Sequence, residues 1–160
     1  MAKIECLYIL YKSGRLSDLK LNDHKRIVAC LTPLINIDSC IQPMQLVLSE
    51  VVPLLPPKII SIYGILISPI WDSAWKTDEP TAGQILFILR LQNHAPVMAV
   101  VNGARVFQIG DKSMIKRIVN AVKSCLQNSE DDLAADLVSQ FKSSPIFTKL
   151  WTRLSSKQIF

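Results

Sequence analysis

The sequence is poor in the residues from which catalytic and metal sites are built. It has two histidines and five scattered glycines, and none of its four cysteines belongs to a C-x-x-C pair. Zinc-protease, serine-hydrolase, dinucleotide and Walker patterns are missing too, so we expect no metal, no cofactor and no small-molecule substrate. We interpret Cys6, Cys30, Cys40 and Cys125 as reduced thiols of an intracellular protein.

Charge is also scarce. Charged residues make up 19% of the chain and hydrophobic residues 49%, which argues against disorder. At 160 residues the chain predicts a single domain, 1–160, that is large enough to fold without a metal or a disulfide. The surplus of apolar surface favours a protein partner or self-association, so we expect a homo-oligomer.

Long hydrophobic segments are lacking as well. Ile4–Tyr11 is too short for a signal peptide and contains Glu5, and no small-residue cleavage site follows it. The longest uncharged apolar stretch, Ile59–Ile70, is too short to span a bilayer and is interrupted by Gly64 and Pro69. We therefore expect a cytoplasmic, nuclear or peripheral protein that is not secreted and has no transmembrane segment.

The segment 85–109 carries the strongest structural signal. Three apolar runs, Ile85–Leu91, Val97–Val101 and Ala104–Ile109, follow one another, and Asn102-Gly103 separates the last two. Asn-Gly between β-prone runs is typical of a type I′ hairpin, because that turn needs positive φ at both central residues. We predict three consecutive antiparallel strands, covered on both faces because both faces are apolar.

The N-terminal half adds further predicted elements. Ile4–Tyr11, Leu16–Leu21 and Ile59–Ser68 are interpreted as strands, and His24–Leu31 as a helix capped by Asn22 or Asp23. Met44–Val52 suits a strand or a helical turn equally. Prolines make 53–57 a rigid connector.

The last third is predicted to be helical. Apolar residues recur at helical spacing over Ile115–Leu126, and Ser129 is expected to cap a second helix whose first turn is acidic. A third, amphipathic helix is expected at about 145–157. The predicted fold class is thus α+β, with a largely antiparallel sheet, one early helix and two or three late helices.

Three tryptophans are candidate anchors for a partner. Trp71 and Trp75 lie in a polar segment, 69–83, that we predict to be an exposed loop, and Trp151 lies on the apolar face of the last predicted helix. The alternative for Trp71 and Trp75 is that they fold back as a lid on the core.

Basic residues recur along two predicted helices, and the net charge of the chain is +5. They suit an anionic partner, either an acidic membrane surface or a nucleic acid, although an ordinary solvated face has the same pattern. The candidate residues for binding an anionic surface are Lys112, Lys116, Lys123, Lys149, Arg153 and Lys157.

These features favour a non-catalytic assembly or interaction protein that presents basic helices to an anionic surface. Its profile fits a viral matrix-type or accessory structural protein. One alternative is a longin-like trafficking or assembly-chaperone module, because such domains share the predicted order of strand, turn, strand and helix. The other is a small enzyme that brings Cys6 close to His24 or His94.

Overall fold

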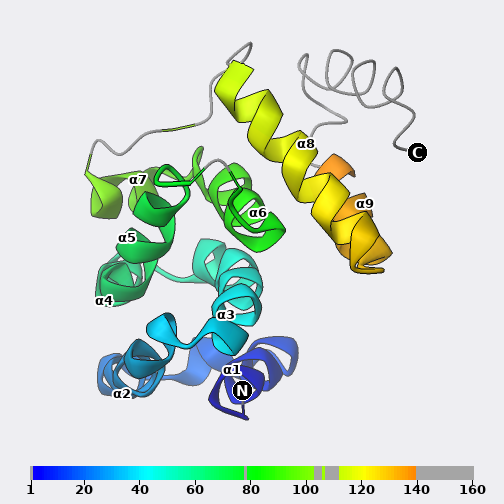
Figure 1. Cartoon of the computed structure of the whole chain (residues 1–160). Coiled ribbons are helices and arrows are strands. Elements are labelled where there is room, and N and C mark those ends of the chain that lie inside the picture. Colours follow the sequence, from blue (N-terminus) through cyan, green and yellow to red (C-terminus); the bar gives the residue numbers. More distant parts are fainter. Residues whose placement is uncertain (1, 78, 103–105, 107–111, 140–160) are drawn as a thin grey trace.

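The computed structural model describes residues 2–77, 79–102, 106 and 112–139, and every regular element in these ranges is a helix (Figure 1). The α-helices of this part are α1 (Ala2–Lys12), α2 (Leu21–Leu31), α3 (Asp38–Val51), α4 (Pro57–Ile62), α5 (Gly64–Ser73), α6 (Ala82–Leu91), α7 (Ala95–Val101), α8 (Lys112–Gln127) and α9 (Asp131–Ser139). Short 3-10 helices at Arg15–Asp18, Thr32–Asn36 and Val52–Leu54 link the first four of them.

Helix α6 is the central element. α3 packs along it in the most extensive helix–helix contact, and α5, α8 and α9 also contact it. α1 and α2 pack together beside α3, and α7 covers both α4 and α5 (Figure 1). Of the residues of α6, only Leu89 and Arg90 keep partial exposure. None of the helices described here combines the length and apolarity needed to cross a bilayer.

The predicted antiparallel sheet is wrong, and the described fold is all-α rather than α+β. Ile4–Tyr11 lies in α1, Ile59–Ser68 in α4 and α5, Ile85–Leu91 in α6 and Val97–Val101 in α7. The physical reason is clearest for α6. A run of apolar residues that is buried on nearly all sides has neither the two-residue nor the 3.6-residue period, so hydrophobicity alone does not separate strand from helix.

Asn102 ends a helix instead of turning a hairpin. It has φ 47° and ψ 72°, in the left-handed region, and its N–H donates to the Met98 carbonyl at 3.1 Å. Asparagine is one of the few residues that enter this region readily, and helix ends use it as hairpins do. The predicted third strand, Ala104–Ile109, lies outside the described residues except for Val106.

A capping box fixes the start of α6. The Gln84 N–H donates to Thr81 Oγ1 at 3.1 Å, and the Thr81 N–H donates to Gln84 Oε1 at 2.9 Å. Two backbone donors that the helix leaves unpaired are satisfied in this way. The chain therefore enters α6 at Thr81 and cannot form the extended run that was predicted from Ile85 onwards.

Only the middle of the segment 69–83 is the exposed loop that was predicted, because α5 ends at Ser73, α6 begins at Ala82, and Lys76, Thr77 and Glu79 between them are exposed. Helix α5 continues through Pro69 to Ser73, and Trp71 has no exposed surface. Its ring meets the Phe87 ring edge-on, with the two centroids 6.4 Å apart. Trp75 is half-buried and packs against the same core. Both indoles thus fold inward, as the lid alternative expected.

Several helical predictions agree with the structure. His24–Leu31 lies within α2, Ile115–Leu126 lies within α8, and α9 begins with Asp131 and Asp132 in its first turn. The predicted caps differ. Lys20 holds the N-cap position of α2, and Ser129 has φ 58° at the turn before α9.

The connector 53–57 is extended only in its middle, because both of its ends belong to helices. Pro53 lies in a 3-10 helix, Pro56 is extended, and Pro57 is the first residue of α4, where a missing N–H costs nothing. The ambiguous segment Met44–Val52 belongs mostly to α3. The amphipathic helix predicted at about 145–157 lies outside the described residues.

Gly83 of α6 faces two glutamine side chains of α3. A Cβ atom added at Gly83 would lie 2.7 Å from Gln45 Oε1 and 3.1 Å from Gln42 Cγ, so the end of the Gln45 side chain would have to move and Gln42 would have to shift slightly. The absence of a side chain at Gly83 therefore leaves room for both glutamines.

A hydrogen-bonded pair of aromatic side chains is buried between α2 and α4. His24 is 2% exposed, and its Nδ1 lies 3.0 Å from the hydroxyl of the fully buried Tyr63. Burial raises the pKa of Tyr63 to about 12, because the phenolate would lose its hydration. Burial also lowers the pKa of His24, and the nearby Asp23 carboxylate only partly opposes this.

Replacing Trp71 by alanine should lower the free energy of unfolding by about 3–5 kcal/mol, because it removes a large buried ring and leaves a cavity. Urea denaturation followed by circular dichroism measures this. Ile65→Ala on the same helix is the control, because Ile65 is 56% exposed, and its effect should stay below about 0.5 kcal/mol. Equal losses in the two variants would contradict the burial of Trp71.

Stability should fall with acidification through His24. The pKa of this imidazole is lowered in the folded protein from an ordinary value of 6.5, so the unfolded chain binds the proton more readily. The free energy of unfolding should therefore drop as the pH falls below 6.5, until the pH reaches the folded pKa, and then level off with respect to this group. Denaturation of His24→Gln across this pH range tests whether His24 causes the loss of stability. His94→Gln is the control. If His24→Gln loses as much stability on acidification as the wild type, another group is responsible for the loss.

Candidate functional site

Helix α8 divides cleanly into an apolar and a polar face. Ile118 and Val122 have no exposed surface, and the helix contacts α6 and α9. Lys116, which is exposed, and Lys123, which is half-buried, flank this apolar face. Figure 1 shows α8 at the edge of the molecule beside α6 and α9, as expected for a helix with one apolar face.

Three of the predicted binding residues share one face of α8. Lys112, Lys116 and Lys123 are separated by four and seven residues, close to one and two helical turns. The side chain of Lys112 is not among those described. The helix backbone nevertheless carries all three positions along a single line.

Arg117 lies further round the same helix and has a structural role. Its Nε donates to the Thr77 carbonyl at 3.1 Å, and its guanidinium also contacts Ser113 Oγ. Thr77 belongs to the segment that leads into α6. Arg117 therefore ties α8 to that segment.

The other predicted site residues divide into two groups. Lys149, Arg153, Lys157 and Trp151 lie outside the described residues. Trp71 is inside them but fully buried, and Trp75 is half-buried. A side chain without exposed surface offers nothing to a partner, so the position of Trp71 does not support a role as anchor.

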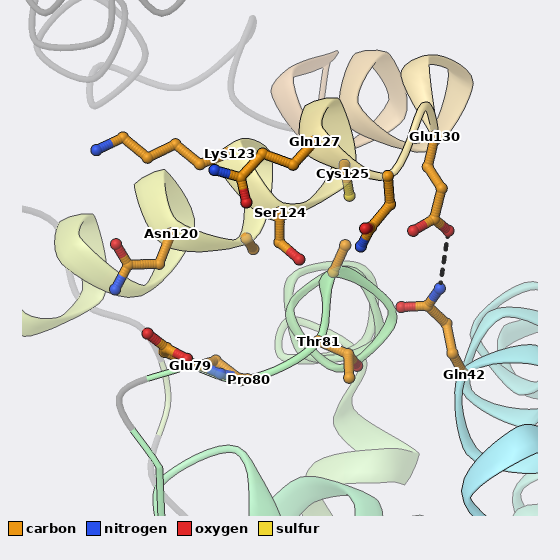
Figure 2. A pocket seen from close by; sticks show the side chains of 13 residues that line it. Gln42, Glu79, Pro80, Thr81, Asn120, Lys123, Ser124, Cys125, Gln127 and Glu130 are labelled. Atoms are coloured by element: carbon orange, nitrogen blue, oxygen red, sulfur yellow. Dashed lines mark hydrogen bonds between the residues drawn. The ribbon is translucent and has the colours of Figure 1, made fainter.

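A polar cleft of about 560 Å³ lies between α8, the segment before α6, and α3. Figure 2 shows Asn120, Ser124 and Lys123 of α8 on one side and Glu79, Pro80 and Thr81 on the other. The full lining is Gln42, Glu79, Pro80, Thr81, Ala82, Asn120, Ala121, Lys123, Ser124, Cys125, Gln127, Asn128 and Glu130.

One end of this cleft is closed by a hydrogen bond between distant parts of the chain. Gln42 Nε2 of α3 donates to Glu130 Oε2, just before α9, at 3.2 Å (Figure 2). Lys123 supplies one positive charge to the lining, and Glu79 and Glu130 supply two negative charges. The lining therefore carries one more negative than positive charge, which disfavours an anion inside the cleft, whereas the exposed Lys116 lies outside it.

The cleft also lacks an activated nucleophile among its described side chains. Cys125 is 3% exposed, and its pKa is raised by burial and by the nearby Glu130 carboxylate. A raised pKa keeps the sulfur as a thiol, which is a weak nucleophile. No histidine lines the cleft.

The Cys–His pair of the enzyme alternative is not formed in the described part of the chain. His24 is hydrogen-bonded to Tyr63, while Cys6 and Cys30 line a groove between α1 and α2 together with Lys3 and Arg26. No cluster of three metal-ligating side chains occurs among the residues described either.

Comparisons with known proteins give no lead to a function. No protein-family model, no curated protein and no solved structure matches this chain. Any function assigned to it therefore has to come from the chemistry of its own residues.

Sequence reasoning missed the cleft. Gln42, Thr81 and Glu130 come from three separate elements and are joined only by the packing of α3, α6 and α8. Only the Thr81-x-x-Gln84 capping signal was available beforehand, and it marks a helix start rather than a site.

Thiol reactivity should separate the four cysteines into two pairs. Cys6 and Cys30 are exposed, whereas Cys40 and Cys125 are buried. We expect iodoacetamide to modify the buried pair at least roughly tenfold more slowly, because alkylation there requires local opening. Mass spectrometry of the timed reaction measures this, and the urea-unfolded chain is the control. Fast labelling of Cys125 in the folded protein would contradict the described cleft.

Proposed function

We propose that this chain is a non-catalytic binding protein whose helix α8 contacts the phosphate backbone of a nucleic acid. The observation that carries the proposal is the charge of α8. Over Lys112–Gln127 it has four basic residues, Lys112, Lys116, Arg117 and Lys123, and no acidic one. Lysines that recur along one line of a helix, with no carboxylate among them, suit contact with the charged phosphates of a nucleic acid.

The neighbours of these lysines favour nucleic acid over a membrane surface. The exposed and half-exposed side chains around them are hydroxyls and amides: Ser113 and, at the edge of the cleft, Asn120, Ser124 and Gln127. Such groups hydrogen-bond to phosphates and sugars. A membrane-surface helix needs large apolar side chains beside its lysines, and the exposed large hydrophobic residues of the described chain all lie on other elements.

The C-terminal sequence adds charge of the same sign. Residues 140–160 contain Lys142, Lys149, Arg153 and Lys157 and no acidic residue. Each lysine or arginine that neutralises a phosphate releases counterions and adds salt-dependent affinity. We propose that this stretch contributes to the same interaction as α8.

Self-association receives no specific support from the described surface. The exposed large hydrophobic residues are Tyr8, Ile9, Leu21, Ile37, Leu54 and Ile65. They are spread over α1, α2, α5 and two connectors, and scattered apolar side chains are ordinary on soluble proteins. The homo-oligomer therefore stays a prediction from composition.

The proposal keeps the accessory or structural role expected from the sequence. The longin-like alternative depended on a sheet, and no strand occurs in the described ranges. The enzyme alternative depended on a contact between a cysteine and a histidine that the described cavities do not show. A scaffold that coats or organises a nucleic acid needs neither feature.

Changing Lys112, Lys116 and Lys123 together to glutamine should weaken binding to a fluorescein-labelled oligouridylate and flatten its salt dependence. The slope of log K against log salt should shrink by about 2, since each lost contact to a single strand removes about 0.7. Fluorescence anisotropy over a series of NaCl concentrations measures both effects.

The matched control removes the same charge elsewhere. Lys3, Lys25 and Lys58 are exposed on α1, α2 and α4, and their change to glutamine should leave the slope nearly unchanged. Equal slopes for the two triple variants would show that α8 is not the binding surface. Tighter binding of the wild type to phosphatidylglycerol vesicles than to the oligouridylate, at equal salt, would favour a membrane partner instead.

A further inference from the structure

A second cavity, of about 320 Å³, lies at the opposite end of the molecule from α8. It is enclosed by the end of α1, the first 3-10 helix, the start of α2 and the connector into α4. Its lining is Tyr11, Gly14, Leu16, Ser17, Leu19, His24, Leu54, Leu55, Pro56 and Ile59. The walls are mostly aliphatic, and His24 is the one ionisable group besides the Tyr11 phenol.

The hydrogen bond between His24 and Tyr63 fixes which imidazole nitrogen carries the proton. Tyr63 is fully buried, and His24 Nδ1 is its one side-chain partner among the described residues. If Nδ1 held the proton, the Tyr63 hydroxyl hydrogen would be buried without an acceptor, which is costly. The satisfied arrangement has the Tyr63 hydroxyl donating to Nδ1, so Nε2 carries the proton.

Nε2 of His24 is a donor without an acceptor in the described chain. Among the described residues, the only side-chain hydrogen bond of His24 is made through Nδ1, and Nε2 does not belong to the unpartnered side-chain atoms that have no exposed surface. His24 is 2% exposed and lines the cavity, so a molecule in the cavity would lie against this imidazole. The cavity thus combines aliphatic walls with one imidazole that has a free N–H.

We propose that this cavity binds a small apolar molecule with a single neutral acceptor, such as a ketone, ester or amide carbonyl, which accepts a hydrogen bond from His24 Nε2. The apolar body of the ligand contacts Leu16, Leu55 and Ile59. This combination of apolar walls and one placed polar group is the usual composition of small-molecule sites, and the volume lies at the lower end of their range. The proposal is independent of nucleic-acid binding by α8.

The neutral state of the imidazole selects a neutral ligand. Burial lowers the pKa of His24, so at pH 7 the ring offers a donor but no positive charge. A carboxylate placed in this aliphatic cavity would lose its hydration without gaining a counter-charge. An uncharged carbonyl oxygen loses much less and gains the same hydrogen bond.

A pair of probes of equal shape tests the hydrogen bond. 2-Acetylnaphthalene carries a carbonyl acceptor where 2-isopropenylnaphthalene has a methylene group. Titrations of the full-length protein, followed by ¹H–¹⁵N correlation spectra of the imidazole nitrogens, should give roughly two- to tenfold tighter binding of the ketone. The spectrum of the free protein should show His24 protonated at Nε2, and the ketone should shift that resonance. His94→Gln assigns the signals.

Two variants separate the hydrogen bond from the cavity. His24→Phe removes the donor and should abolish the preference for the ketone. Ser17→Trp fills the mouth of the cavity from an exposed position, so it should weaken both probes at least tenfold without altering the core. Ser39→Trp, at an exposed position of α3 outside the cavity, is the control and should bind like the wild type.

The proposal is overturned by any of three results. They are no binding of either probe to the wild type, unchanged binding to Ser17→Trp, and an Nδ1-protonated His24 in the free protein. If His24→Phe does not fold, the Ser17→Trp comparison and the wild-type spectra still decide between the outcomes.

Discussion

The packing of α3 against α6 is the constraint on which the rest of the structure depends. Because α6 is covered on nearly every side, its polar groups must find partners inside the protein. Thr81 Oγ1 donates to Gln45 Oε1 at 2.8 Å, Gln84 Nε2 donates to Ser73 Oγ, and Arg90 donates to Ser49 Oγ at 2.8 Å. These bonds join α6 to α3 and α5 and fix the rotation of α6 about its axis. Both the apolar seat of α8 and the polar cleft follow from that rotation.

Sequence patterns predicted the helices that have one apolar and one polar face. They failed where the helix is apolar on all faces. In α8 one face is apolar and the other basic, so the 3.6-residue period is visible and the helix lies where it was expected. In α6 the run from Ile85 to Leu91 is buried all round and has no period, and β-branched and aromatic residues favoured a strand. Thr81 and Gln84 already carried the correct signal, because a capping box immediately before an apolar run marks a helix start.

The two candidate sites differ in a similar way. The lysine row depends on residues close together in the sequence, and the cleft depends on residues far apart in it. The lysine row of α8 was predictable because helical spacing alone aligns Lys112, Lys116 and Lys123. The cleft was not, since Gln42 meets Glu130 across 88 positions of the chain, and the His24–Tyr63 pair spans 39 positions. Side chains brought together over such separations depend on tertiary packing, which no pattern within a window of residues records. Asn102 illustrates a further limit, because its positive φ serves a helix end as well as a hairpin.

The contact between α3 and α6 is sensitive to substitution of Gly83. An added methyl group there would make the end of the Gln45 side chain move and would shift Gln42, whose side chain holds Glu130 at the end of the cleft. A substitution at this uncharged, buried position would therefore disturb the core and the cleft at once, while leaving every lysine in place. Inactivating mutations selected at random should accumulate at this glycine as well as on the basic surface, and compensating changes should arise at Gln45 or Gln42, where a shorter side chain restores the lost space.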